Sequence, residues 1–485
     1  MKGLMLFTIA GVLLSTQLSA QLVIPNAGFE KTDDQSPTKT KYWKVESNDF
    51  SCVADNKKPH TGKYSLHITS KTAGNHFFNE EFNFHSSELK KYRIWVAFKT
   101  KGLDGKAQFG ARVFDSKGGT ITKTVFTLTE QKDQDWTMAE GVFVSDENAA
   151  KLRVFGNLFG TGEVWFDNVL IAEIPRPTKQ PSNEVMLYLH EFFDIVYQNS
   201  LITDKNYLAE LKAKTLYLCA DNIDMKQCHD ILQYYTTPLF KDGHSFFTTQ
   251  QDWKGMNEGG QHPVTGEVHH EMPSGRLLKD DIAYIHIPMF ISSDKQLMQQ
   301  YADQAQRLIA DFDHKNVKGY IIDVSDNGGG NSLPMIAGVG PLLGDGVCGY
   351  SFSGDGSLKT RIYNEGTVAW DTTINFRKAD PYEPKNKNKP IAVIYGPGTA
   401  SSGEVTAISF IGLPNSRSFG QATYGATTRV DNFELSDGSY LNLASGYDAD
   451  RNKREYKGPI KPDVATDDNE TAIEEAVKWI LQYSD

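Results

Sequence analysis

Cysteine is scarce in this sequence, and its scarcity excludes two classes of protein. The 485 residues include only four cysteines, which are Cys52, Cys219, Cys228 and Cys348. The chain is therefore not a small scaffold held by disulfides. No cysteine–histidine spacing suits zinc, and we expect no metal at the functional site. Cys219 and Cys228 flank a short turn, where they either pair after export or stay as buried free thiols.

An excess of positive charge is also missing. Lysine and arginine number 50 against 61 aspartates and glutamates, which gives a net charge of −11. A nucleic-acid partner requires a basic face, so this balance argues against one, and it gives no sign of binding to acidic membranes. A helix that spans a bilayer needs about 20 apolar residues, and no run reaches that length. Protein, peptide and carbohydrate substrates remain.

The first twenty residues have the pattern of a targeting signal. Lys2 supplies a positive start, residues 4–14 form an apolar run, and Leu18-Ser19-Ala20 offers small residues before Gln21. No cysteine stands at the cleavage point for lipid attachment. We therefore expect residues 1–20 to be a signal peptide and the mature protein to be exported, either periplasmic or secreted.

The remaining chain is long enough for about three domains of roughly 150 residues. Short runs such as 64–68 and 92–96 alternate apolar and polar residues between turns, which is typical of the strands of a β-sandwich. Prolines at 175, 177 and 181 indicate a stiff linker. The expected order is a β-sandwich at 21–174, the linker at 175–183, a helical subdomain at 184–250, a connecting loop at 251–280 and an α/β core at 281–485.

Strands and helices alternate in the predicted core. Apolar strands are expected at 282–287, 319–324 and 391–395, with a helix at 295–312 between the first two. Such alternation predicts a mostly parallel sheet covered by helices. A closing helix is expected at 470–482.

A serine follows the strand at 391–395, in the sequence GPGTASSGE that includes Ser401. A serine at a strand-to-helix corner projects from the sheet and lies near the positive end of the helix dipole, which suits a nucleophile. The spacing Ser401-x-x-Glu404 equally fits a capping box, in which the serine only satisfies backbone donors. This segment alone leaves both readings open.

Three glycines follow the strand at 319–324, in the sequence SDNGGGN. They allow the backbone to approach a ligand closely with its N–H groups facing inward, as an oxyanion hole requires. A phosphate loop is disfavoured because no Lys-Ser or Lys-Thr pair follows, but a simple tight turn explains the glycines equally well. A third segment, DGHS at 242–245, contains His244, which by itself reads as an ordinary surface histidine.

Together these segments resemble the carboxyl-terminal processing (tail-specific) peptidases, a family that also includes the tricorn core and the retinoid-binding protein of the retina. The segments follow the family's order over about residues 184–485: the helical subdomain, the DGHS turn, the glycine loop, the serine turn and a final KPDV at 461–464. The resemblance implies a crotonase- or ClpP-like α/β core and a serine peptidase that needs no cofactor.

Two departures from the usual family pattern indicate which branch of the family the chain resembles. The lysine of the Ser-Lys dyad of bacterial members falls on Ala426 here. The PDZ domain that the family usually inserts needs about 80 to 90 residues, and the interval from Phe246 to Asp281 is too short for it. Both departures favour the branch similar to the tricorn core, where a histidine replaces the lysine as the base.

That branch implies a Ser401 nucleophile activated by His244, because an imidazole takes a proton readily near neutral pH. The family places a glutamate shortly before the Pro-Asp pair, which makes Glu455 the predicted partner of the imidazole, with Ser245 helping to hold that carboxylate. The predicted oxyanion hole consists of the backbone N–H groups of Gly328 or Gly329 and of Ser402.

The N-terminal part carries a resemblance of its own. The sequences NAGFE at 26–30, HTGKYS at 60–65 and GEVWFDNV at 162–169 are similar to jelly-roll modules of the carbohydrate-binding and galactose-binding-like kind, whose acidic residues near the ends often serve a structural calcium ion. We expect this module either to bind a glycan or to act as a spacer or docking module. Two further functions stay open: a catalytically silent binding protein on the same core, and a carbohydrate-binding protein that works through this module.

Overall fold

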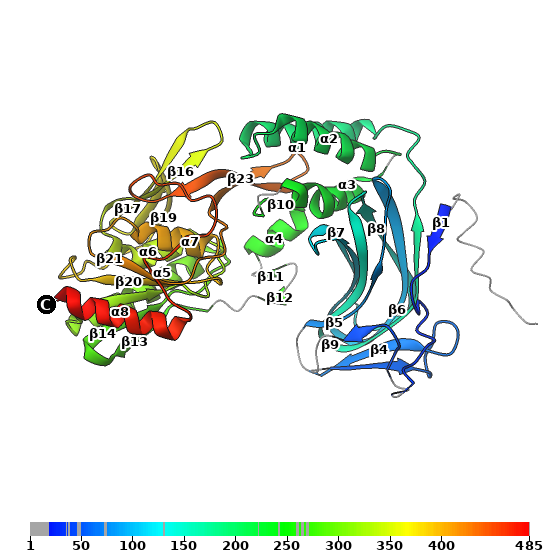
Figure 1. Cartoon of the computed structure of the whole chain (residues 1–485), viewed down its shortest axis with the longest axis horizontal. Helices are drawn as coiled ribbons and strands as arrows, with labels where there is room; N and C mark the ends of the chain where they lie inside the picture. The colour runs from blue at the N-terminus through cyan, green and yellow to red at the C-terminus, as the bar shows by residue number, and fades with distance from the viewer. Residues whose placement is uncertain are drawn as a thin grey trace, which may run out of the picture. The chain divides into compact units, whose positions relative to one another are not determined.

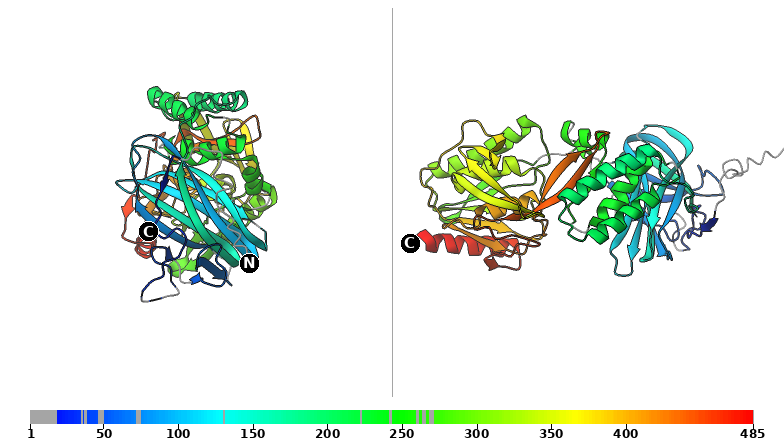
Figure 2. Two further views of the ribbon diagram at one scale, coloured as in Figure 1. Left: turned by 90° about the vertical axis from the view of Figure 1, so that its right-hand side faces the viewer. Right: turned by 90° about the horizontal axis from the view of Figure 1, so that it is seen from above.

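The computed structural model describes residues 19–34, 36, 39–45, 50–71, 75–129, 131–221, 223–240, 243–258, 261–262, 266–267 and 271–484. The chain forms two compact units, the first from Met1–His190 with Asn206–Lys241 and the second from Glu191–Lys205 with Asp242–Asp485 (Figures 1 and 2). The predicted signal peptide lies outside the described residues except for its last two. Within the described residues, no helix has both the length and the apolar character needed to cross a bilayer.

The first unit is rich in antiparallel strands, and β6 and β9 are by far the longest of them. Both pair with each other along most of their length, while β5 and β4 extend the sheet from β9, and β7 and β8 extend it from β6. Alternate residues such as Phe109 and Val154 face the apolar core, so the residues between them form a second face. The described strands are β1 (Ser19–Leu22), β2 (Lys44–Val45), β3 (Ser51–Asp55), β4 (Ser65–Ser70), β5 (Asn75–Asn83), β6 (Lys90–Asp115), β7 (Thr120–Thr129), β8 (Gln134–Ser145) and β9 (Ala149–Glu173).

Helices follow the strands, as the apolar spacing predicts. The division between the two units passes through α1 (Asn183–Asn199), and α2 (Lys205–Leu218) and α3 (Met225–Ile231) follow it. Helix α3 begins where the Asp224 carboxylate accepts from the Gln227 N–H at 2.8 Å, which caps a free donor of the first turn. A π-turn at Leu232–Thr236 and a 3₁₀ turn at Thr237–Phe240 lead toward the histidine.

A six-stranded sheet forms the centre of the second unit, and its strands confirm the predicted core strands. The order is β13-β14-β15-β20-β21-β24, with β13 antiparallel at one edge and the others parallel. The strands are β13 (Ser274–Leu278), β14 (Ile282–His286), β15 (Gly319–Asp323), β20 (Ile391–Tyr395), β21 (Ser416–Gly420) and β24 (Val464–Ala465).

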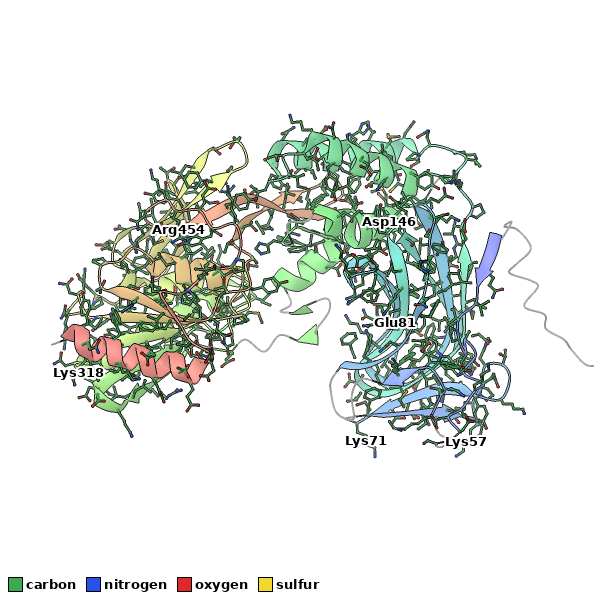
Figure 3. All side chains as sticks on the ribbon, in the orientation of Figure 1. Lys57, Lys71, Glu81, Asp146, Lys318 and Arg454 are labelled. Atoms are coloured by element: carbon green, nitrogen blue, oxygen red, sulfur yellow. The ribbon has the colours of Figure 1, made fainter. Side chains whose placement is uncertain are left out.

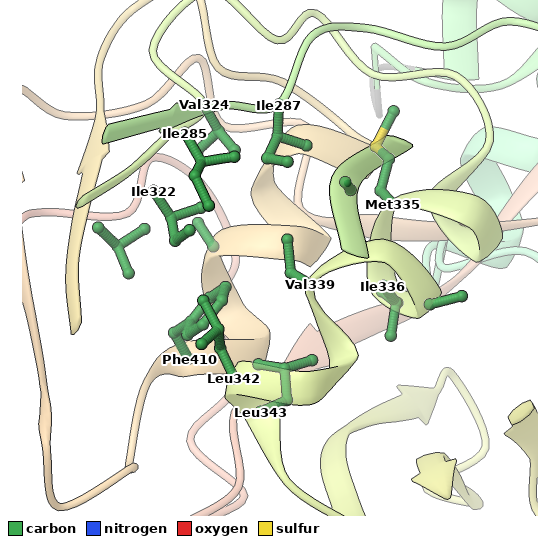
Figure 4. Packing of buried hydrophobic residues seen from close by; sticks show 14 of the residues in the cluster. Ile285, Ile287, Ile322, Val324, Met335, Ile336, Val339, Leu342, Leu343 and Phe410 are labelled. Atoms are coloured by element: carbon green, nitrogen blue, oxygen red, sulfur yellow. The ribbon is translucent and has the colours of Figure 1, made fainter. Parts of the chain in front are cut away.

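Both faces of this sheet are apolar, as expected for parallel strands covered by helices. On one face, residues such as Ile285 and Ile322 pack with α5 (Lys295–His314), α6 (Ser332–Leu343) and α7 (Ser402–Phe410) (Figure 4). On the other face, the residues between them, such as Ile321, pack with α8 (Asn469–Ser484). The central strands are thereby held rigidly, and the loops at their carboxyl ends are fixed in place.

A second, antiparallel sheet brings together segments that are far apart in the sequence. Strand β23 (Tyr440–Ala449) pairs with β10 (Phe246–Thr248), with β22 (Thr428–Glu434) and with β16 (Gly346–Ser353). Because β10 begins two residues after His244 and β22 begins at Thr428, this pairing sets the position of both residues. The sheet is completed by β17 (Leu358–Asn364), β18 (Thr367–Trp370) and β19 (Thr373–Arg377).

The segment expected as a connecting loop, 251–280, contains regular structure as well. Helix α4 (Gln250–Glu258) carries Trp253, whose ring stacks on Tyr440 with 4.0 Å between the ring centroids. The short strands β11 (Gln261–His262) and β12 (Gly266–Glu267) pair with each other. The tertiary contact of Trp253 explains why a segment of weak helical pattern forms a helix here.

Candidate active site

Ser401 lies at the corner between β20 and α7. Its backbone φ is +48°, a conformation that residues with a side chain adopt only under strain of about 1–3 kcal/mol. The buried Glu404 holds this corner, since its carboxylate accepts from the Ser401 N–H at 3.0 Å. The glutamate thus has the place that a capping box predicts. The capping interpretation of the sequence therefore holds for Glu404, and the catalytic interpretation depends on what faces the serine hydroxyl.

His244 meets the serine across 157 positions of sequence. Its Nε2 lies 2.9 Å from Ser401 Oγ, within hydrogen-bond reach, and both side chains are half-buried. A serine hydroxyl whose proton faces an imidazole nitrogen is the arrangement that turns it into a nucleophile. The structure therefore brings together the two residues that the sequence nominates as nucleophile and base.

The other ring nitrogen of His244 faces a threonine. Nδ1 lies 2.7 Å from Oγ1 of Thr428, the first residue of β22. When Nδ1 carries the proton and donates it to this hydroxyl, the lone pair of Nε2 points at Ser401, which is the tautomer a general base needs. Sequence reasoning missed Thr428, because a threonine at the start of a strand carries no local signal.

Glu455 does not have the place that the sequence predicts for it. It is exposed, and its carboxylate lies 3.1 Å from Lys457 Nζ. Ser245 does not hold that carboxylate; its hydroxyl accepts from the Ala444 N–H at 2.9 Å, which fastens the histidine turn to β23. The physical reason for both corrections is the β10–β23–β22 pairing, which brings Thr428 to the ring instead.

The glycine loop lies against the serine. A Cβ added to Gly329, whose φ is +113°, would lie 2.8 Å from Ser401 Cβ, so only glycine fits there. The Gly329 N–H donates to Asn327 Oδ1 at 3.0 Å and is not available to an oxyanion. The N–H groups of Gly328 and Ser402 have no acceptor among the described residues, and of the predicted donors they are the pair left for an oxyanion.

The side chain of Asn327 holds the glycine loop in place, and the sequence did not predict this role. It is fully buried, and its Nδ2 donates to the carbonyls of Ile287 at 2.9 Å and Pro288 at 3.1 Å. Ser402 Oγ adds a bond of 2.6 Å to the Gly330 carbonyl. An amide within a run of glycines after a buried strand is the signal that could have identified Asn327.

Two buried carboxylates lie behind the site. Burial raises the pKa of Glu404, although bonds from Thr423 Oγ1 at 2.5 Å and the Gly425 N–H at 2.9 Å act in the opposite direction. Burial likewise raises the pKa of Asp448. The Asp448 carboxylate forms an ion pair with Arg361 at 2.6 Å, and the charge of His244 acts to lower its pKa. Asp448 is thus a buried carboxylate that interacts electrostatically with His244.

Comparison with known proteins gives the class of this domain. Residues 281–466 match the family described as Peptidase family S41. A nisin-resistance protein of Lactococcus lactis subsp. lactis is 35% identical over 200 residues, 40% of this chain and 58% of that protein, so the match spans little more than half of that relative. A lipoprotein from Streptococcus agalactiae has 28% identity and a TM-score of 0.52, over 62% of this chain and 96% of that chain. The photosystem II D1 C-terminal processing protease has 14% identity and a TM-score of 0.43, over 59% of this chain and 94% of that one.

The chain therefore carries a peptidase domain of the serine type, and this domain is one of family S41, the family of the carboxyl-terminal processing proteases. The family resemblance of the sequence is confirmed for residues 281–466. Ser401 lies inside the matched range and His244 lies before it. Within the described residues, no group of three or more histidine, cysteine, aspartate or glutamate side chains is arranged to hold a metal.

Proposed function

We propose that the chain is an exported serine peptidase that cleaves peptide bonds through an acyl-enzyme on Ser401, with His244 as the general base. The observation that carries the proposal is the 2.9 Å contact between His244 Nε2 and Ser401 Oγ beside two N–H groups left over for an oxyanion. The S41 domain supports it, and residues 1–20 support export. The core is accordingly proposed to be of the crotonase or ClpP type.

In the first half of the reaction, Ser401 Oγ attacks the carbonyl carbon of the peptide while His244 Nε2 takes the hydroxyl proton. The carbonyl oxygen becomes an anion, and the N–H groups of Gly328 and Ser402 stabilise it. The carbon–nitrogen bond then breaks, and the imidazolium gives its proton to the leaving amine. In the second half, water attacks the ester by the same route, and the carboxylate product and free Ser401 are released.

The proposed substrate is a peptide or protein. The name of the Lactococcus relative connects that protein with resistance to nisin, so nisin is the first substrate to test. The chain aligns with only 58% of that relative, and for this reason a library of unrelated peptides belongs in the same experiment.

A fluorophosphonate probe tests the nucleophile directly. Ser401→Ala should abolish labelling and peptide cleavage, and His244→Gln should lower both by orders of magnitude. Ser436→Ala is the control, because Ser436 is exposed and bonds to Glu191. Labelling that persists in the Ser401 variant would show a different nucleophile. Absence of labelling and cleavage in the folded wild type would favour the catalytically silent binding protein.

We also propose that residues 21–174 form a jelly-roll sandwich with a structural calcium ion at Glu30 and Asp167. A Cβ added to Gly28 would lie 3.7 Å from Asn168 Oδ1, 3.9 Å from Asp167 Oδ1 and 3.7 Å from Glu30 Cγ, so these three side chains lie close together. Burial, and in smaller measure the charge of Glu30, raises the pKa of Asp167 to about 6, and a cation would relieve both effects. Calcium should raise the melting temperature of the wild type and leave that of Asp167→Asn unchanged.

A further inference from the structure

The backbone of Met289 is held against the glycine loop from both sides. The carbonyl of Pro288, the residue before it, accepts from Asn327 Nδ2 at 3.1 Å. The N–H of Phe290, the residue after it, donates to the Gly329 carbonyl at 3.3 Å. Met289 therefore stays beside this loop as long as both bonds are intact, while its side chain keeps the rotational freedom of an unbranched methionine.

The sulfur of Met289 lies beside a donor of the proposed oxyanion hole. A Cβ added to Gly328 would lie 3.5 Å from Met289 Sδ. The backbone nitrogen of a residue lies about 2.5 Å from its Cβ, so Sδ is within about 6 Å of the Gly328 nitrogen. The Gly328 N–H has no acceptor among the described residues, and it is one of the two donors left for an oxyanion. Any change in the chemistry of this sulfur therefore occurs next to the place where a substrate carbonyl binds.

Met289 is exposed, unlike two other methionines that contact the same loop. Its side chain belongs to a residue that is 42% exposed. Met335 is fully buried in the apolar cluster of the core (Figure 4), and its sulfur accepts from Asn327 Nδ2 at 3.6 Å. Met298 is 5% exposed, and its sulfur accepts from Asn331 Nδ2 at 3.6 Å. An oxidant dissolved in water therefore reaches Met289 before it reaches the other two.

We propose that Met289 is a reversible oxidation site, and that its conversion to methionine sulfoxide closes the oxyanion hole and inactivates the enzyme. The inference rests on the proposed serine peptidase, in which the Gly328 N–H stabilises the oxyanion. An exported protein works in an oxidising environment, where it meets peroxides that the cytoplasm would remove. The exposed thioether gives such a protein a means of switching off cleavage while the oxidant is present.

The chemical step changes an apolar side chain into a hydrogen-bond acceptor. Hydrogen peroxide transfers one oxygen atom to Sδ: the O–O bond breaks, an S–O bond forms, the sulfur loses two electrons and water is released. A hydrogen bond of about 2.9 Å from the new oxygen spans much of the distance to the Gly328 N–H, and rotation of the side chain covers the rest. A substrate carbonyl then finds its donor already occupied.

The reverse step restores the thioether. Two thiols supply two electrons and two protons, the S–O bond breaks, and the products are water, a disulfide and the original methionine. Methionine sulfoxide reductases carry out this reaction, with one enzyme for each epimer of the sulfoxide. Inactivation through Met289 is therefore reversible, whereas damage to the fold is not.

Treatment of the full-length protein with hydrogen peroxide tests the proposal. As the tryptic peptide of Met289 gains one oxygen in mass spectra, kcat/KM for a peptide that the untreated enzyme cleaves should fall about a hundredfold. The rate of fluorophosphonate labelling should fall in parallel. Both reductases together with dithiothreitol should restore cleavage and labelling. The melting temperature should change little, because the oxidised side chain is exposed.

Three variants separate Met289 from the other methionines, each compared with its own untreated protein. Met289→Leu has no sulfur and should keep its activity through the treatment. Met138→Leu is the matched control and should be inactivated as the wild type is, because Met138 is 46% exposed but lies on β8 of the first unit, whose side chains Figure 3 draws. Met289→Gln carries an amide oxygen near the position of the sulfoxide oxygen and should be about tenfold less active without any oxidant.

The outcomes distinguish this inference from the proposed function. Absence of labelling and cleavage in the untreated, folded wild type would refute the serine peptidase and this inference with it. A wild type that is labelled before treatment, and that stays active while it carries the Met289 sulfoxide, would overturn the inference alone. Equal inactivation of the wild type and Met289→Leu would also overturn it, as would full activity of Met289→Gln, oxidation of the buried Met335 before Met289, or a loss of activity that the reductases do not reverse.

Discussion

Thr428 Oγ1 lies 2.7 Å from His244 Nδ1, in the place where serine peptidases of the triad type have a carboxylate. A neutral hydroxyl can accept from Nδ1–H and so select the productive tautomer, but it adds no charge of its own. The carboxylate that interacts electrostatically with His244 is Asp448, which is buried and paired with Arg361. In the proposed mechanism, Thr428 therefore orients the imidazole, and any electrostatic support comes from a different residue, Asp448.

Replacement of Thr428 should separate its orienting role from a structural one. Thr428→Val keeps the shape but removes the acceptor, and we expect kcat/KM to fall about ten- to a hundredfold because the imidazole samples the wrong tautomer. Thr428→Ser keeps the hydroxyl and should retain most activity. The measurement is kcat/KM on a peptide substrate for the wild type and both variants. Equal activity of the valine and serine variants would remove Thr428 from the mechanism.

Gly329 offers a test of the contact between the glycine loop and the nucleophile. Gly329→Ala forces a Cβ to within 2.8 Å of Ser401 Cβ, whereas Gly356→Ala, at a φ of +82°, meets nothing within 4 Å. Both variants carry the strain of a positive φ, about 1 kcal/mol, and Gly329→Ala adds the clash with Ser401, so it should lose more stability in urea unfolding. Only Gly329→Ala should lose activity, by about a hundredfold or more. Equal losses of activity would show that general destabilisation is responsible.

The sequence predicts the parts of this site that have a local pattern. The apolar runs at 282–287, 319–324 and 391–395 are buried strands because both faces of a covered parallel sheet are apolar. Ser401 and His244 stand in turns whose glycines mark them. These features need only neighbouring residues to be recognised.

Features that depend on pairing across the chain were not predictable in this way. Thr428 reaches His244 only because β22 and β10 both pair with β23, and no periodicity in the sequence indicates that pairing. Glu455 was placed by its distance from the Pro-Asp pair, but the bridge it forms opposite Ala449 leaves its carboxylate exposed beside Lys457. The distance of a residue from a motif in the sequence predicts the segment in which it lies. The register of the strand pairing determines the face of the sheet to which its side chain points.

The raised pKa of Glu404 predicts how stability depends on pH. An acid whose pKa is raised by burial favours the folded state most at a pH below its ordinary value of 4.5, and this contribution is lost as pH rises through the raised pKa. Glu404→Gln does not titrate, so the free energy of unfolding of the wild type relative to this variant should fall as pH rises above 4.5 and then level off. Urea unfolding of both proteins between acid and neutral pH measures the difference. A difference that rises with pH would contradict the assignment.

The same variant should also affect catalysis. Glu404 accepts from the Ser401 N–H and from two groups of the segment that leads to Thr428, and a glutamine offers one acceptor oxygen instead of two. The strained corner is then held less firmly, and we expect kcat/KM to fall about tenfold with little change in KM. Fluorophosphonate labelling rates provide a second measure of the nucleophile. Unchanged labelling in a folded Glu404→Gln variant would show that the corner does not need this carboxylate.

Cys219 and Cys228 provide a test of export, because a disulfide between them forms only in an oxidising compartment. Their sulfurs lie 3.8 Å apart and are buried, so rotation of the side chains can bring them to the bond length of about 2 Å. In an oxidising compartment we expect a disulfide across these nine positions, which should raise the free energy of unfolding by about 2–3 kcal/mol over the reduced protein. Mass spectrometry without reductant should find the peptides of Cys219 and Cys228 joined, and Cys228→Ser should abolish the gain in stability. Cys52→Ser is the control, because burial raises the pKa of Cys52 to about 12 and keeps its thiol unreactive. Free thiols at both positions in protein isolated from outside the cytoplasm would contradict the prediction.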